Sequence, residues 1–175
     1  MAESRQRCDI KIGQHKGGEM VKNYSDVYIR ELLNEVTSIA VVGASSKPHR
    51  DSYKVVKRLM EYGYRVIPVN PNEIGNNIMG QTFYADLTSI NEPIDMVDVF
   101  RSSDAVMGIA QEAIEIGSKV LWTQLDIVNI EAANLAEKAG LKVIMDRCPK
   151  MELAKPYLAP GVWSIRTGKR ELNGI

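Results

Sequence analysis

Short apolar runs alternate with longer amphipathic segments along most of the chain. The apolar runs lack regular polar alternation, as expected of strands that are covered on both faces of a sheet. Strands are predicted at residues 38–42, 65–69, 96–100, 120–122 and 143–145. The intervening segments repeat apolar residues at helical spacing, and helices are predicted at residues 25–34, 52–62, 103–116 and 130–139 and after Pro149. This alternation predicts an α/β fold, a doubly wound parallel sheet of about five strands with helices on both faces.

Glycine follows three of the predicted helices, at Gly63, Gly117 and Gly140. A residue just past a helix often takes a positive φ, which glycine adopts without steric cost. These glycines therefore support the predicted helix ends. The stretch 70–82 differs, because proline, glycine and asparagine recur there and predict an irregular segment.

The first strand of the predicted sheet runs into a loop of small, hydroxyl and basic residues. Gly43 ends the apolar run, the small residues 44–46 follow it, and Lys47 and Arg50 precede the next helix. A helix start presents free backbone N–H groups and about half a positive charge, so it favours a phosphate. The first strand–loop–helix unit of an open α/β sheet is the usual place for this contact. The segment predicts a phosphate-binding loop but leaves open which phosphate compound it binds.

The composition is that of an ordinary globular domain. Of the 175 residues, 45% are apolar and 25% are charged, and the chain is long enough to bury a core. The 22 basic residues balance the 22 acidic ones, so a strongly basic nucleic-acid surface is not indicated. We expect a polar, flexible leader over residues 1–24 and one domain over residues 25–175.

Membrane and metal-binding classes are also disfavoured. No apolar run approaches the roughly 20 residues that span a bilayer, and the start of the chain lacks a signal peptide's apolar centre. The two cysteines, Cys8 and Cys148, form neither a disulfide framework nor a four-ligand metal set. We therefore expect a cytoplasmic protein without a metal centre.

A dinucleotide site would carry two further signs, and both are weak or missing. The glycine fingerprint of such sites needs glycine at the positions of Ser45 and Pro48. The acidic residue that binds the ribose should end the second strand, but residues 69–71 are Val-Asn-Pro. Asn70 could bond a ribose hydroxyl, although it lacks the charge of a carboxylate. The sequence thus disfavours NAD and NADP.

Several different short motifs lie at or near the ends of the predicted strands. They are Val-Gly-Ala-Ser at 42–45, Arg-Asp-Ser at 50–52 with Val55, Gly-Tyr-Arg-Val-Ile-Pro-Val-Asn-Pro at 63–71, Val-Phe-Arg at 99–101, Trp-Thr-Gln at 122–124 and Met-Asp-Arg-Cys at 145–148. Over about residues 39–152 the chain resembles the small stand-alone CoA-binding proteins, which are similar to the N-terminal CoA-binding domain of the succinyl-CoA synthetase alpha subunit. The resemblance implies a Rossmann-like domain. One position departs from the family pattern, since Asp126 stands where glycine is usual, and a carboxylate near a phosphate is unfavourable unless it points away.

The resemblance also implies how CoA would bind. The diphosphate would meet the N–H groups of residues 44–46 and of the following helix, with Lys47 or Arg50 as a charged partner. Residues 69–71 would pack against adenine, and the pantetheine arm would pass residues 100–102. The implied site residues are Gly43, Ala44, Ser45, Ser46, Lys47, Arg50, Ser52, Tyr53, Val69, Asn70, Pro71, Phe100, Arg101, Ser102, Val106, Trp122 and Gln124.

Several of these residues have a second interpretation that the sequence leaves open. Arg101 could pair with Asp98 or Asp104 rather than with a ligand. Trp122 could belong to the core, where bulky aromatic residues usually lie. Cys148 could be a buried, inert thiol, a reactive one, or one that forms a disulfide with CoA under oxidation.

No group of residues in the sequence indicates a reaction. The resemblance implies that catalysis in the synthetase alpha subunit needs a phosphorylated histidine in a second domain, and only about thirty residues, without histidine, follow the last predicted strand here. We expect a non-catalytic protein that binds CoA or an acyl-CoA as a carrier, sensor or regulatory partner. A homo-oligomer or a protein partner stays open, and no nucleic-acid or membrane partner is expected. The alternative is a small NAD(P)-dependent oxidoreductase or transferase with a degenerate dinucleotide fingerprint.

Overall fold

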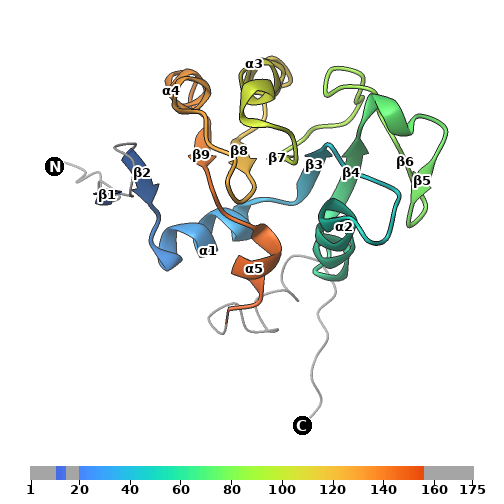
Figure 1. Ribbon diagram of the computed structural model, residues 1–175, viewed down its shortest axis with the longest axis horizontal. Helices are drawn as coiled ribbons and strands as arrows, with labels where there is room; N and C mark the ends of the chain where they lie inside the picture. The colour runs from blue at the N-terminus through green and yellow to red at the C-terminus, as the bar shows by residue number, and fades with distance from the viewer. Residues whose placement is uncertain (1–10, 15–19, 156–175) are drawn as a thin grey trace, which may run out of the picture. The chain divides into compact units, whose positions relative to one another are not determined.

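The computed structural model describes residues 11–14 and 20–155, which form two compact units (Figure 1). The unit that ends at Glu35 consists of the antiparallel strands β1 (Lys11–Gln14) and β2 (Met20–Asn23) and of helix α1 (Asp26–Glu35). The helix predicted at residues 25–34 is confirmed, whereas the two strands were not anticipated. The rest of the predicted leader lies outside the described residues.

The second unit, from Val36 on, is built on a parallel sheet of five strands. They are β3 (Ser38–Val42), β4 (Arg65–Val69), β7 (Met96–Val99), β8 (Val120–Thr123) and β9 (Lys142–Ile144). Their order in the sheet is β4-β3-β7-β8-β9, which confirms the doubly wound topology. The order reverses at β3, which pairs with both β4 and β7. In such sheets a ligand crevice forms at the carboxyl ends of the strands beside this reversal.

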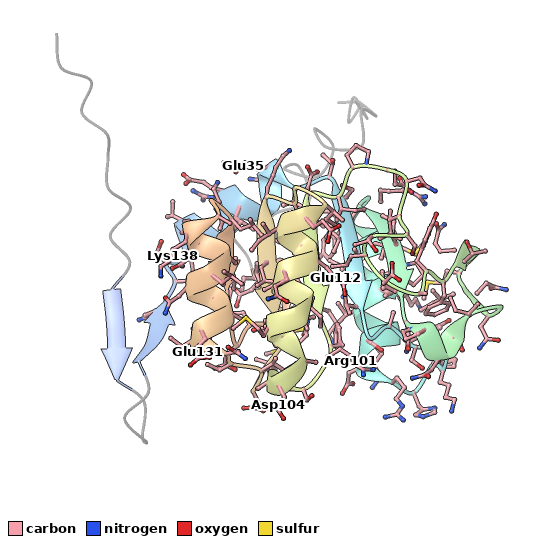
Figure 2. All side chains as sticks on the ribbon, turned by 90° about the horizontal axis from the view of Figure 1, so that it is seen from above. Glu35, Arg101, Asp104, Glu112, Glu131 and Lys138 are labelled. Carbon is pink, nitrogen blue, oxygen red and sulfur yellow. The ribbon has the colours of Figure 1, made fainter. Side chains whose placement is uncertain are left out.

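Helices cover both faces of the sheet. Helices α3 (Val106–Glu115) and α4 (Ile130–Lys138) lie side by side on one face, and α2 (Asp51–Glu61) and α5 (Pro149–Leu153) lie on the other (Figures 1 and 2). The core under α3 and α4 includes Val97, Val99, Leu121, Ile109, Ala113, Ala132 and Ala136. Small alanines on the two helices let them pack closely on the β-branched residues of the strands. The described part has no helix long and apolar enough to cross a membrane.

The predicted boundaries hold within a few residues, with one larger difference. The glycines after α2, α3 and α4 have positive φ, as expected. The stretch 70–82, however, contains a 3-10 helix, η1 (Pro71–Glu73), and a hairpin of β5 (Asn77–Ile78) and β6 (Gln81–Thr82). A second 3-10 turn, η2 (Ser103–Ala105), leads into α3. Elements of two or three residues are too short to show a hydrophobic period, so the pattern did not predict them.

Candidate functional site

The backbone around Gly43 joins the carboxyl ends of β3, β4 and β7 by hydrogen bonds. Its N–H donates to Val69 O at 2.8 Å, and Phe100 N donates to Val42 O at 2.8 Å. Gly43 has a φ of +86°, and a Cβ there would lie only 2.6 Å from Phe100 O. A side chain at this position would therefore force β3 and β7 apart, and glycine is required for this close approach.

A cavity of about 550 Å³ opens beside the loop that follows β3. Its lining is Gly43, Ser45, Lys47, His49, Arg50, Asp51, Ser52, Asn70, Glu73 and Phe100. Arg50 is the N-cap of α2, and its side chain makes no capping hydrogen bond, so it leaves the N–H groups of the first turn of α2 uncapped. The cavity thus offers helix-terminal donors and two cationic side chains to an anion, next to the carboxylates of Asp51 and Glu73.

Glu73 is one of three residues of this cavity, with His49 and Asp51, that were not predicted as site residues. Its carboxylate accepts hydrogen bonds from Ser45 Oγ at 3.1 Å, from Ser46 Oγ at 2.7 Å and from Asn76 Nδ2 at 2.9 Å. The Ser46 hydroxyl, followed by the Asn76 amide, holds the pKa of Glu73 below its usual value. The side chain is buried. An acid in a turn-rich segment gives no periodic signal, so nothing in the sequence pointed to this contact.

The side chain of Asn70 also forms hydrogen bonds with the backbone, one of them to the loop after β3. Its Nδ2 donates to Ala44 O at 2.8 Å, and its Oδ1 accepts from Asn72 N at 3.1 Å. Each end of this amide therefore already has a backbone partner that fixes its orientation. Pro71 follows at the first position of η1, where the missing N–H of proline costs no hydrogen bond.

A second cavity, of about 380 Å³, adjoins the first and shares Asp51 and Phe100 with it. Its other lining residues are Val55, Gln124, Leu125, Ile127, Cys148, Lys150 and Met151. The two cavities together extend from the loop after β3 to the start of α5. Apolar side chains are more frequent in the second cavity than in the first.

A buried polar pair lies beside the second cavity. Gln124 Nε2 donates to Asp98 Oδ1 at 2.7 Å and to Asp98 Oδ2 at 3.0 Å. Asp98 is fully buried, and this burial raises its pKa to about 7. Burial also raises the pKa of the Cys148 thiol, and the negative charge of Asp98 adds to that effect. The backbone N–H groups at the start of α5 and the charge of Lys150 act in the opposite direction, but the net effect is a raised pKa, so the thiol is protonated at neutral pH.

The structure brings eight of the predicted site residues to the cavities. They are Gly43, Ser45, Lys47, Arg50, Ser52, Asn70, Phe100 and Gln124. The remaining predicted residues line neither cavity, namely Ala44, Ser46, Tyr53, Val69, Pro71, Arg101, Ser102, Val106 and Trp122. No group of three metal-ligating side chains occurs in the described part of the chain.

Two of the residues outside the cavities had alternative interpretations. Trp122 is fully buried, and its Nε1 donates to Arg147 O at 2.7 Å, so it is part of the core. Arg101 forms no ion pair with Asp98 or Asp104 within the described residues. Arg101 and Asp104 lie at the same end of the domain, near the start of α3 (Figure 2). The Cδ of Arg101 would be 3.0 Å from a Cβ on Gly43, so the arginine stem covers the back of the glycine.

The family model for the CoA binding domain matches residues 37–154, and this range contains every residue that lines the two cavities. The chain belongs to this CoA-binding family. The resemblance stated from the sequence is thereby confirmed.

Relatives of known sequence and structure agree with this assignment. The uncharacterized protein YneT of Bacillus subtilis is 40% identical over 131 residues, which are 75% of this chain and 96% of YneT. The alpha subunit of the ADP-forming acetate–CoA ligase I of Pyrococcus furiosus is 34% identical over 82% of this chain, which spans only 31% of that subunit. The solved structure of the Thermus thermophilus protein ID.343 superposes with a TM-score of 0.70, at 36% identity, over 74% of this chain and 96% of that one.

Asp126 shows how this member of the CoA-binding family accommodates its departure from glycine. The residue has a φ of +63°, a conformation that aspartate tolerates better than most residues do. Its N–H donates to Asp146 Oδ1 at 2.8 Å, and it lines neither cavity. The carboxylate therefore does not face a ligand in either cavity.

Proposed function

We propose that this chain binds CoA or an acyl-CoA without transforming it. The observation that carries the proposal is the pair of adjoining cavities at the carboxyl ends of the strands. The first has the helix start and the cations that suit a nucleotide diphosphate, and the second has apolar walls that suit a long neutral arm. A nucleotide with a pantetheine arm matches both, whereas a simple mononucleotide would fill only the first.

The surroundings of Cys148 support a binding role rather than a catalytic one. A thiol acts as a nucleophile when a base or a positive field lowers its pKa. Burial and the charge of Asp98 instead raise the pKa of Cys148. We therefore assign the thiol to the wall of the second cavity.

One observation favours the alternative, a site for NAD or NADP. Glu73 follows β4 closely and lines the first cavity, near the place where an acidic residue binds ribose in dinucleotide sites. However, its two oxygens already accept three hydrogen bonds from Ser45, Ser46 and Asn76. A ribose would have to compete with these three donors for the carboxylate, so CoA is the better match.

Calorimetric titration of the protein with CoA, acetyl-CoA, NAD and NADP tests the proposal. We expect CoA or acetyl-CoA to bind at least about tenfold more tightly than either dinucleotide, a difference of about 1.4 kcal/mol. Tight NAD or NADP binding without any response to CoA would overturn it.

A pair of arginine variants locates the site. Arg50→Gln removes a cation from the first cavity and should weaken CoA binding by about tenfold. Arg58→Gln is the matched control. Arg58 also lies in α2, but it lines neither cavity and instead forms an ion pair with Glu61, at a distance of 3.2 Å. Equal effects of the two substitutions would show that the general charge of the protein, and not this cavity, determines binding.

A further inference from the structure

The Asp98–Gln124 pair fixes which end of the Gln124 amide is left for a ligand. An ionised carboxylate only accepts hydrogen bonds, so it holds the donor end of the amide, and Nε2 reaches both Asp98 oxygens. Among the described residues, none donates to Gln124 Oε1. Gln124 lines the second cavity, so a ligand that meets this unpaired acceptor would do so from that cavity.

The apolar lining of the second cavity makes this acceptor important for ligand affinity. Apolar side chains such as Val55 and Ile127 line the same cavity. An acceptor that loses water on ligand binding without gaining a donor costs about 1–3 kcal/mol. A ligand that enters this cavity therefore binds well only when it places an N–H group opposite Oε1.

We propose that Asp98 is a positioning residue that turns Gln124 so that Oε1 accepts a hydrogen bond from an amide N–H of the pantetheine arm, and that a proton on Asp98 reverses this orientation. This inference rests on the proposed CoA-binding function. It adds a specificity-determining contact for the arm and a pH dependence of that contact.

The chemistry of the protonated pair gives the direction of the effect. A neutral Asp98 carboxyl has one O–H donor and one acceptor oxygen, and it pairs best with an amide that offers both ends. The amide would then turn so that Oε1 accepts from the carboxyl and Nε2 donates to it. The acceptor of the cavity is lost, and the arm binds more weakly.

The neighbours of Asp98 leave it as the group that titrates near neutral pH. In the sheet register Asp98 lies between Val41 and Trp122, neither of which ionises. The Cys148 thiol stays neutral because its pKa is raised, and Lys150 on α5 contributes a positive charge to the same cavity. Asp51 on α2 stays ionised because Lys54 lowers its pKa. By contrast, burial brings the pKa of Asp98 to about 7.

The test compares CoA with 3′-phosphoadenosine 5′-diphosphate, its head without the arm, by calorimetry between about pH 6 and pH 8. Both ligands carry the 3′-phosphate, whose protonation changes both affinities alike. The ratio of the two affinities at each pH is therefore largely independent of that protonation. We expect the affinity of CoA relative to the head to fall by about tenfold from the upper to the lower pH. A relative affinity that is independent of pH overturns the inference.

The Asp98→Asn variant separates orientation from a merely structural role. An asparagine there pairs with both ends of the Gln124 amide, so CoA should bind as weakly at every pH as it does to the unmodified protein at low pH. The head should bind normally, which also shows that the variant is folded. Equal losses for CoA and head, or a retained pH dependence, contradict the inference alone. Absence of CoA binding at every pH overturns the proposed function together with it.

Discussion

Gly43 is the residue on which the geometry of the site depends most directly. Gly43→Ala would combine a positive φ with a Cβ only 2.6 Å from Phe100 O, and the neighbouring backbone cannot yield without opening the sheet. We expect a loss of about 2–4 kcal/mol in the free energy of unfolding, measured by urea titration. The folded fraction should also bind CoA more weakly, because the loop is displaced.

Gly75 provides the matched control for this substitution. It has a φ of +89°, but a Cβ there would meet nothing within 4 Å. Gly75→Ala therefore measures the cost of the backbone conformation alone, about 1 kcal/mol. Equal losses for the two variants would show that the contact with Phe100 O does not constrain the loop.

The thiol of Cys148 should react slowly with alkylating reagents. The side chain is 6% exposed, and burial raises its pKa, so little thiolate is present at neutral pH. In a Cys8→Ser variant, where Cys148 is the one remaining cysteine, we expect alkylation by iodoacetamide to be at least about tenfold slower in the folded protein than in urea. Equal rates in the two conditions would restore the interpretation of Cys148 as a reactive thiol.

At the scale of elements, Glu73 joins η1 to the loop after β3. Glu73→Gln removes the negative charge that accepts from Ser45 and Ser46, and we expect a loss of about 1–2 kcal/mol in stability. It also removes a negative charge from the lining of the first cavity, so the phosphates of CoA should bind several-fold more tightly. Urea unfolding and calorimetry measure the two effects.

Glu61→Gln on α2 is the control for the Glu73 variant, because Glu61 is exposed and lines neither cavity. It should change neither quantity appreciably. Weaker CoA binding by Glu73→Gln would mean that the carboxylate prepares the serine loop for the ligand and does not compete with it.

For the molecule as a whole, the sheet could be predicted because its signals are local. Each buried parallel strand is a short apolar run, and each helix end carries its own glycine. The phosphate loop is likewise continuous in the sequence from Gly43 to Arg50. By contrast, Glu73 meets its serines across 28 and 27 residues, and Gln124 meets Asp98 across 26. Contacts between distant loops depend on how the strands are ordered, which a single sequence does not reveal.

The same ordering creates a polar clamp at the opposite ends of the strands. Asp95, just before β7, accepts from Thr37 N at 2.8 Å and Thr37 Oγ1 at 2.7 Å, both just before β3. It also pairs with Lys119 Nζ at 2.7 Å, just before β8. Burial alone would raise the pKa of Asp95, but the hydrogen bonds from Lys119 and Thr37 outweigh it and hold the pKa well below the usual range. One carboxylate thus ties together the starts of three neighbouring strands.

The stability of the whole sheet should therefore depend on acid through this carboxylate. A depressed pKa in the folded state contributes stability above the unfolded value of about 3.9, and that contribution is lost as the pH falls toward the folded value. Asp95→Asn should lower the free energy of unfolding by about 2 kcal/mol at pH 7, and the difference from the unmodified protein should shrink below about pH 4. Asp104→Asn, at an exposed carboxylate near the start of α3, is the control and should have little effect. Urea titrations across this pH range measure the difference, and a constant gap between the two proteins would exclude Asp95 as the source of acid sensitivity.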